Sequence, residues 1–304
     1  MPGFSLLAPR GLGHCLPVHR SKLTALALLM LTLPAWAEDP EPGQDEAQAV
    51  IDSFPWQREG TAKLGAQATL TIPPTFRFLT GAQASKLVER MGNLSSHKEL
   101  GLIGTDDLGW FVLFFFDDVG YVKDDEKDEL DAEKMAETMR ENLVASNEER
   151  KEHNLEELNF DGWAIPPRYN PETKQLEWAH RLRSVNGVSV NYNTRVLGRR
   201  GVMRVILVTD PELLQATLPA YADLMKGFQF TAGEDYSSFK AGDKVAEYGL
   251  IALVAGGAGA VAAKTGLLSA VLVFFKKGAK LIVIGVAALA AFLKKVFTGK
   301  KDSA

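Results

Sequence analysis

The chain has 304 residues, of which 46% are hydrophobic, 24% charged and 9% aromatic, and it contains one cysteine. This composition excludes a collagen-like protein, a disulfide-stapled scaffold and a wholly disordered chain, and the length allows one sizeable core. The formal net charge of −4 conceals three blocks: residues 1–37 carry +3, residues 38–240 carry −13 and residues 241–304 carry +6. An acidic body therefore lies between two basic, apolar ends.

The N-terminal block has the pattern of an export signal. Arg20 and Lys22 precede an uncharged run of 11 residues, 23–33, which is followed by Pro34 and a small-x-small site at 35–37. Eleven residues are too few to cross a bilayer, which needs about 20. Residues 1–37 are therefore predicted to be a signal peptide. The 22 residues before the run are long for such a signal and leave the true start codon open. The alternative is a short buried helix of a cytosolic protein.

Cleavage after this site would remove Cys15, the only cysteine. The mature chain would then have neither an internal disulfide nor a thiolate nucleophile. Cys15 also precedes the apolar run, whereas a lipid-modified cysteine would follow it. No lipid anchor is therefore expected.

Residues 38–240 are predicted to form one exported domain. Apolar and polar residues alternate over 63–72, which predicts a half-buried strand that ends at a pair of prolines. The continuous apolar run 110–116 predicts a central strand covered on both faces. Residues 131–151 have one apolar helical face and predict an amphipathic helix capped by Asp131.

Further strands are predicted close together along the second half of this domain. Their short connections contain Asn-Gly and Gly-rich turns, which force neighbouring strands to be antiparallel. A helix capped by Asp210 is predicted from Pro211 to about Lys226, followed by a closing strand at 228–230. The predicted fold class is α+β, with a largely antiparallel sheet and flanking helices. The predicted strands span residues 157–165, 175–183, 188–197 and 201–209.

The C-terminal block, 241–304, is predicted to be a membrane anchor with a basic tail. Residues 249–275 contain one charge, Lys264, and a helix of this length covers about 40 Å against a hydrocarbon core of about 30 Å. Lysines follow directly, so the positive-inside rule places the tail in the cytoplasm and residues 38–240 across the membrane. The predicted location is the bacterial cytoplasmic membrane, with the main domain on the periplasmic or extracytoplasmic side.

A second uncharged run, 281–293, is short for a return crossing. A helix in the cytoplasmic interface, with lysines directed to anionic headgroups, fits this run slightly better than a hairpin of two short helices. One versus two membrane segments therefore stays open. Ala252, Gly256 and Ala260 recur every four residues, a spacing that allows close helix packing and predicts self-association. The alternative is that small residues are simply common in membrane helices.

No catalytic, metal or cofactor pattern is present. The acidic stretch 117–131 lacks the glycine and glutamate that a helix–loop–helix calcium site requires, so it is interpreted as a solvated loop; a calcium-regulated module is a third possibility. The histidines outside the signal, His97, His153 and His180, have no zinc-site spacing. Phosphate-binding glycine loops, dinucleotide motifs and nucleophile elbows are also missing. No metal and no cofactor are expected.

The candidates for a binding surface are clustered aromatic and arginine residues, because these types dominate binding hot spots. The alternative is that the aromatics fill the core and the arginines neutralise an acidic domain. Nucleic acid is not an expected partner, since the charge of −13 on 38–240 would repel phosphate. The candidates are Trp163, Tyr169, Trp178, Tyr192, Arg195, Arg199 and Arg200.

Four segments resemble the DUF2167 family of bacterial membrane-anchored proteins. They are GYVKDDEKDELDAE (120–133), GWAIPPRYNPETKQLEWA (162–179), VNYNTRVLGRRGVM (190–203) and GDKVAEYGLIALVAGG (242–257). The resemblance implies an exported, membrane-anchored protein and supplies no activity, because the family is functionally uncharacterised. The strand, helix and GFQF (227–230) that close the domain also resemble PsbP/Mog1-like domains, which are small antiparallel sheets with flanking helices.

These observations predict a membrane-anchored envelope protein without enzymatic activity. It would serve as a binding or accessory module for a protein partner or an envelope ligand. Its expected partners are the membrane, a protein and, through the first C-terminal apolar run, a second copy of the chain. The alternative is a membrane-tethered hydrolase whose site is assembled from Asp161, His180 and a serine.

The first test of this prediction is the location and N-terminus of the mature chain. A copy tagged at the C-terminus should sediment with membranes, and mass spectrometry should show that it begins at Glu38, because the signal is removed on export. A soluble cytosolic chain that keeps residues 1–37 would contradict both the signal and the anchor.

Overall fold

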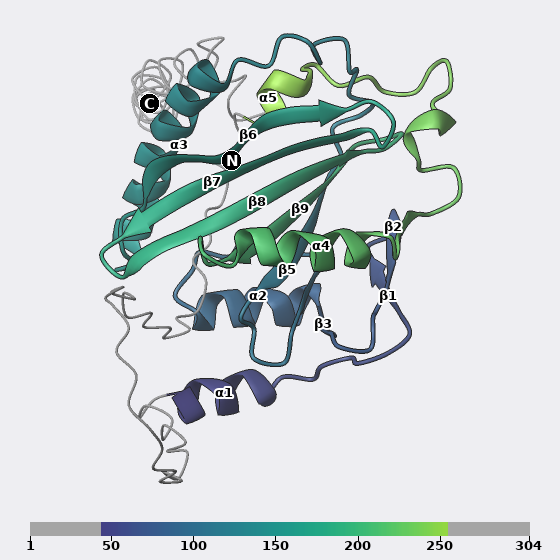
Figure 1. The fold of residues 1–304 in the computed structure, drawn as a ribbon. Helices are drawn as coiled ribbons and strands as arrows, with labels where there is room; N and C mark the ends of the chain where they lie inside the picture. The colour runs from purple at the N-terminus through teal and green to yellow at the C-terminus, as the bar shows by residue number, and fades with distance from the viewer. Residues whose placement is uncertain (1–43, 255–304) are drawn as a thin grey trace, which may run out of the picture.

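A computed structural model describes residues 44–254, with side chains described from residue 46. The predicted signal peptide, most of the apolar run 249–275 and all of the run 281–293 lie outside these residues. The described chain forms a seven-stranded sheet, a small three-stranded sheet and helices packed on them (Figure 1). Every strand pair within the two sheets is antiparallel. The predicted α+β class is therefore confirmed.

The main sheet has the strand order β3-β4-β5-β9-β8-β7-β6. The apolar run predicted as a central strand is β5, an inner strand that pairs with β4 and β9. The four strands predicted after it are β6 to β9, and consecutive ones are neighbours because tight turns join them. The strand bounds are β3 (Arg77–Thr80), β4 (Gly101–Gly104), β5 (Phe111–Asp117), β6 (Asn159–Asn170), β7 (Gln175–Ser184), β8 (Gly187–Leu197) and β9 (Val202–Thr209).

The small sheet corrects the single strand predicted over 63–72. That segment contributes to two short strands, β1 (Thr61–Leu64) and β2 (Ala68–Thr71), which pair as a hairpin. The turn between them includes Gly65 at φ 66°, a left-handed conformation that glycine adopts without steric cost. The predicted closing strand is β10 (Phe228–Phe230), and it pairs with β2 instead of joining the main sheet.

Helices cover both faces of the main sheet. On β5, Val112 belongs to the same apolar cluster as Leu214 of α4, whereas Leu113 belongs to a second cluster with Leu87 of α2. We call these the α4 face and the α2 face. Further along the α2 face, α3 and α5 contribute to a third cluster around Trp178. The helix bounds are α1 (Gln44–Asp52), α2 (Gly81–Arg90), α3 (Ala132–Glu152), α4 (Leu214–Met225) and α5 (Leu250–Val254).

The two predicted helix caps have different outcomes. The Asp131 carboxylate accepts hydrogen bonds, both 3.1 Å, from the backbone N–H groups two and three residues further on. This confirms the predicted start of α3. By contrast, α4 begins at Leu214, and the preceding Leu213 makes no side-chain cap. The Asp210 cap was therefore wrong, because a turn in which the backbone N–H of Leu213 donates to the carbonyl of Asp210 comes before the helix.

One part of the predicted membrane anchor lies within the described chain. Between residues 44 and 254, no helix is long and apolar enough to cross a membrane. The five-residue α5 is the described beginning of the run 249–275. Ala252 lies in α5 and is half-buried. Gly256 and Ala260 lie outside the described residues, so the packing face formed by these three residues stays a prediction.

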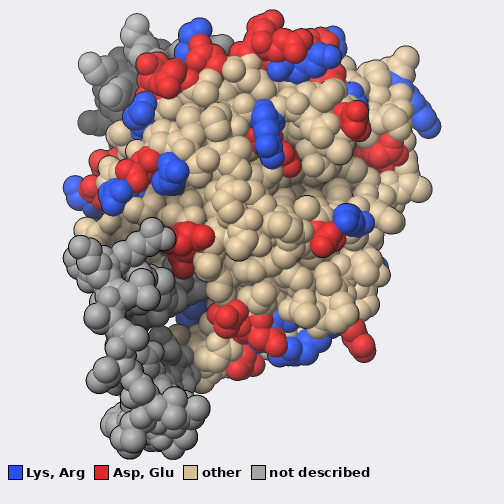
Figure 2. All heavy atoms as spheres, viewed as in Figure 1, with Lys and Arg blue, Asp and Glu red and all other residues tan. Residues whose placement is uncertain are grey.

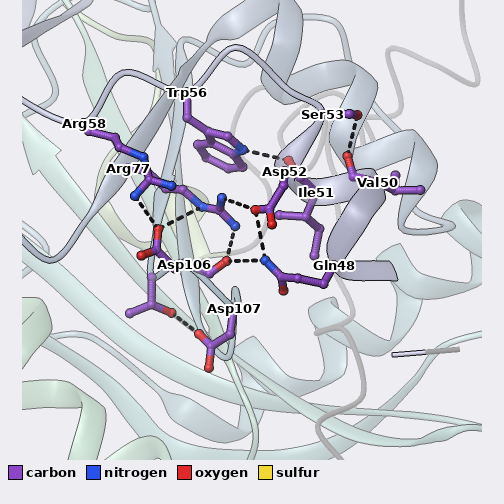
Figure 3. Close-up of polar contacts among 11 residues, drawn as sticks. Gln48, Val50, Ile51, Asp52, Ser53, Trp56, Arg58, Arg77, Asp106 and Asp107 are labelled. Carbon is purple, nitrogen blue, oxygen red and sulfur yellow. Dashed lines mark hydrogen bonds and ion pairs between the residues drawn. The ribbon is translucent and has the colours of Figure 1, made fainter. Parts of the chain in front are cut away.

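A buried arginine helps to attach the N-terminal helix α1 to the body. Arg77 of β3 is 0% exposed, and its Nη1 donates to Asp52 Oδ1 at 2.7 Å while its Nη2 donates to the carbonyl of Asp106 (Figure 3). The guanidinium also lies over the ring of Trp56, with 4.3 Å from Cζ to the centroid. The Trp56 indole N–H in turn donates to the carbonyl of Ile51 at 2.7 Å. Arg77 therefore joins the end of α1 to the β4–β5 loop.

Replacing this arginine should destabilise the domain. Arg77→Ala removes two hydrogen-bond donors and the contact with Trp56, so we expect the free energy of unfolding to fall by about 2–4 kcal/mol in urea denaturation. The control is Arg58→Ala, because Arg58 also pairs with Asp106 at 2.7 Å but is 59% exposed. That variant should lose less than about 1 kcal/mol. Equal losses in the two variants would contradict the role given to Arg77.

Candidate functional site

A cleft of about 400 Å³ opens on the α4 face, between α4 and the strands β6 to β8. Its volume lies within the range of small-ligand pockets, about 300–1,000 Å³. The strands contribute mainly polar side chains and α4 contributes mainly apolar ones. Its lining includes Arg168, Glu177 and Tyr192 from the strands and Leu218, Ala222 and Met225 from α4.

Two tyrosines form the inner wall of the cleft. Tyr192 is 3% exposed and packs edge-to-face on Tyr221, with ring centroids 5.4 Å apart and planes at 72°. The Tyr221 hydroxyl shares a 2.7 Å hydrogen bond with the hydroxyl of Thr194. Burial raises the pKa of Tyr192, and the carboxylate of Glu177 raises it further. Tyr192 therefore keeps its proton at neutral pH, and its hydroxyl hydrogen-bonds with the side chains of Glu177 and Arg168.

An ion pair stands beside these tyrosines. Arg168 of β6 and Glu177 of β7 are cross-strand partners, and Arg168 Nη2 lies 3.1 Å from Glu177 Oε2. The arginine side chain is 61% exposed and the glutamate 19% exposed. An exposed pair contributes under about 1 kcal/mol, so little is lost when Arg168 turns to contact a ligand. The cleft thus offers an adaptable arginine and a tyrosine hydroxyl against an apolar wall.

The α2 face carries a buried polar row on the same strands. Asn193 of β8 lies between His180 and Arg195: its Nδ2 is 3.5 Å from His180 Nδ1, and its Oδ1 is 3.5 Å from the nearest Arg195 nitrogens. Burial lowers the pKa of His180 to about 3, and the positive charge of Arg195 contributes. Burial, together with Arg204, lowers the pKa of Arg195 to about 9. At neutral pH the histidine is uncharged and the arginine is charged.

The two arginines of the β8–β9 turn hold the C-terminal segment. Arg199 Nε and Nη2 donate to the two carboxylate oxygens of Asp243 at 2.7 and 2.8 Å. Arg200 Nε donates to Glu234 at 2.7 Å. Both arginines therefore have a carboxylate partner within the domain.

The acidic stretch 117–131 makes further contacts with this segment. The carboxylate of Asp124 accepts from the Tyr169 hydroxyl at 2.9 Å, from Lys174 Nζ at 3.0 Å and from the Tyr236 hydroxyl at 3.2 Å. The carboxylate of Glu126 accepts from the backbone N–H of Ile251 in α5 at 2.9 Å. This stretch was interpreted as a solvated loop, and in these residues it instead connects the C-terminal segment to the sheet.

The two tryptophans among the sequence candidates lie on the α2 face. The Trp163 indole N–H donates to the carbonyl of Ala132 at the start of α3, at 3.1 Å. Trp178 is 1% exposed and lies under Arg195, with 4.6 Å from the arginine Cζ to the ring centroid. Trp178 and its neighbours therefore belong to the covered side of the sheet.

The structure distributes the seven predicted residues over three places. Tyr192 lies in the cleft; Trp163, Trp178 and Arg195 lie on the α2 face; Tyr169, Arg199 and Arg200 contact the acidic loop or the C-terminal segment. Sequence reasoning missed the other cleft residues. The pairing of Arg168 with Glu177 depends on bulges in β6, which shift the register three times. Gly162, Pro166 and Pro167 indicate an irregular strand there but do not specify the register. For the residues of α4 that line the cleft, the only available signal is the helical period, which predicts which residues share one face of the helix.

The residues proposed for a hydrolase have other partners. Asp161 pairs with Arg183 at 2.6 Å, and both side chains are substantially exposed. His180 is 4% exposed, and its ring lies beside Asn193 and the aromatic rings of Phe160 and Trp163. Over the part of the chain that the structure covers, 44–254, no group of three or more histidine, cysteine or acidic residues could hold a metal ion.

Comparisons with known proteins give one family and one distant neighbour in fold. The family model described as "Protein of unknown function (DUF2167)" matches residues 56–290. Curated proteins give no match. The solution structure of cyanobacterial PsbP (CyanoP) from Synechocystis sp. PCC 6803 is similar to part of the fold. That alignment has 8% sequence identity and a TM-score of 0.33, and it covers 56% of this chain and 90% of that chain.

The buried histidine makes stability depend on pH. In the unfolded chain His180 binds a proton near pH 6.5, whereas in the folded chain it does so only near pH 3. Between these pH values the unfolded state therefore binds more protons than the folded state. The free energy of unfolding falls as the pH drops below about 6.5, because protonation of His180 favours the unfolded chain.

The slope of the free energy of unfolding against pH can be measured by urea unfolding between pH 6.5 and pH 4. We expect His180→Gln to reduce this slope by up to about 1.4 kcal/mol per pH unit. The control is His153→Gln, because His153 lies just after α3 and is exposed. It should leave the slope unchanged. If His180→Gln and the unmodified chain lose stability in parallel on acidification, His180 is not held neutral by burial.

Proposed function

The chain belongs to the DUF2167 family of proteins of unknown function, and we propose that it is a membrane-tethered binding domain of the bacterial envelope. In this proposal the domain lies on the extracytoplasmic side of the cytoplasmic membrane. The cleft on the α4 face receives a segment of a protein partner. The domain acts by binding and carries out no reaction.

The observation that carries the proposal is the distribution of charge around the cleft. In Figure 2, charged side chains gather mostly toward the edges of the face that carries α4, and the middle of the view is largely uncharged apart from two small groups of charged side chains. Protein interfaces have this arrangement, in which a centre poor in charge is surrounded by a polar rim. The cleft adds tyrosine, arginine and methionine, which are enriched at interfaces. A surface of this kind suits a protein segment with apolar side chains.

The contacts of the C-terminal segment support a tether. Arg199 binds Asp243 from the β8–β9 turn, and Glu126 of the acidic loop binds the first turn of α5, so the C-terminal segment is attached to the domain up to the start of the apolar run. A helix that continued from α5 along 249–275 would be long enough to cross a bilayer. The binding domain would then be held close to the membrane. The basic residues after this run, and the signal pattern at the N-terminus, agree in placing the domain outside the cytoplasm.

The hydrolase alternative has less support. A serine hydrolase needs a histidine that can reach the nucleophile and the substrate, and a carboxylate that orients that histidine. The carboxylate of Asp161 is engaged with Arg183, and His180 is buried on the α2 face, away from the cleft. A binding function requires none of these contacts to change.

Site-specific crosslinking in intact cells tests the proposed interface. A photoreactive residue in place of Ala222, which is exposed and lines the cleft, should give a discrete adduct with a protein partner. The same residue in place of Val144, which is 66% exposed on α3, should not give this adduct. Adding Leu218→Asp to the Ala222 probe should reduce the adduct about tenfold or more, because a charge would enter the apolar wall.

The matched control for that substitution is Leu213→Asp. Leu213 is 44% exposed and lies just before α4, outside the residues that line the cleft. It should leave the adduct intact. The proposal is overturned if the probes at 222 and 144 capture the same proteins, or if both aspartate variants reduce the adduct equally.

A further inference from the structure

Two arginines stand directly opposite each other on neighbouring strands of the α2 face. Arg195 of β8 and Arg204 of β9 are register partners, and Arg204 is in turn opposite Phe115 of β5, which packs in the α2 cluster. Like charges that face each other across strands destabilise a sheet. The pair therefore needs a compensating interaction.

Aromatic rings fix the position of both guanidinium groups. Arg195 Cζ lies 4.6 Å from the centroid of Trp178, and Arg204 Cζ lies 4.6 Å from the centroid of Phe115. Stacking on a ring face stabilises a cation while its N–H groups, which lie in the guanidinium plane, stay available as donors. The two guanidinium groups, each a planar fork of N–H donors, are thus held side by side with these donors at their edges.

One carboxylate faces the two arginines. Asp117 Oδ2 lies 2.8 Å from Arg204 Nε as an ion pair, its charge also acts on Arg195, and the Arg204 Nε–H has no hydrogen-bond partner in the described chain. Among the ion pairs found within residues 44–254, none involves Arg195, and its Nη1 and Nη2 each lie 3.5 Å from Asn193 Oδ1. Arg195 is nevertheless only 6% exposed. A buried charge without a close partner carries a large desolvation cost.

A further donor beside the pair also lacks a partner. The indole N–H of Trp178, on a side chain that is 1% exposed, has no hydrogen-bond partner in the described chain. Buried donors in folded proteins are almost always satisfied. Arg195, Arg204 and Trp178 together form a compact set of donors with excess positive charge.

We infer that Arg195 and Arg204 bind an oxyanion, a phosphate or carboxylate group, on the α2 face of the sheet. The group would sit between the two guanidinium forks, whose paired N–H groups match its oxygens. It would enter from the side of Arg204 and Asp117, which are 17% and 33% exposed. This site lies on the opposite face of the sheet from the cleft, and it does not depend on the proposed function.

The chain beyond α5 is a poor source of this anion. Residues 255–304 contain eight lysines and a single acidic residue, Asp302. The oxyanion is therefore expected to come from a separate molecule. It would be either a soluble ligand or the headgroup of an anionic lipid.

The test uses the full chain in nanodiscs of phosphatidylcholine, with inorganic phosphate or succinate added at constant ionic strength set by sodium chloride. Unfolding is followed by tryptophan fluorescence. At about 100 times its Kd, a bound anion should raise the Tm of the unmodified chain by about 5–10 °C. Arg195→Met should remove this rise. Arg200→Met, which removes an arginine that pairs with Glu234, should keep it.

The same variants separate binding from a purely structural role. Without any anion, Arg195→Met should melt at a higher temperature than the unmodified chain, because replacing an unpaired buried charge by an apolar side chain removes its desolvation cost. If Arg195→Met does not fold, Arg195→Lys replaces it; this variant keeps the charge but not the fork and should bind about tenfold more weakly.

A second set of nanodiscs, with phosphatidylglycerol in place of part of the phosphatidylcholine, distinguishes the source of the anion. A higher Tm in these discs that Arg195→Met abolishes assigns the site to a lipid headgroup, and a rise with phosphate or succinate alone assigns it to a soluble ligand. The inference is overturned if neither anion nor anionic lipid changes the Tm, or if Arg195→Met retains the full response.

Discussion

The antiparallel register of β5, β9, β8 and β7 is the constraint on which the other features depend. Residues that face each other across this register lie on the same side of the sheet, and successive residues alternate between sides. Tyr192 therefore reaches the cleft, while Arg195, three residues later on the same strand, reaches the buried row on the opposite face. A slip of one residue would exchange the two sets and place Arg195 beneath α4.

Charge in this domain is used mainly to attach peripheral segments to the sheet. Arg77 attaches α1, Arg199 attaches the segment after β10, and Glu126 receives the first turn of α5. In the described part of this acidic domain, most arginines have carboxylate partners. Some of these ion pairs attach the first and last described segments to the rest of the domain. Arg195 is the contrasting case, because it is buried without one. The proposed tether follows from the first group of contacts and the inferred anion site from the second.

The helices and strands with strong local sequence patterns were the ones that the sequence predicted correctly. Strands β6 to β9 and helix α3 could be predicted because alternation, tight turns and the Asp131 cap all act within a few residues. The sequence pattern predicts one strand where the structure has the hairpin of β1 and β2, since the alternation continues through a turn that Gly65 permits. The cap assigned to Asp210 failed because a turn precedes α4. The candidate site was predicted by residue type, but its grouping depended on bulges in β6.

The sequence by itself determined the α+β class, the pairing of the consecutive strands β6 to β9 and an acidic body between basic, apolar ends, because each of these depends on composition and short-range pattern. It also picked out Tyr192, which the structure places in the cleft, and Arg195, which it places in the buried row. Only the tertiary structure decided which of them share a face. Cross-strand register and helix packing join residues far apart in the chain, so the partners of Arg195 and Tyr192 could not be found from local patterns.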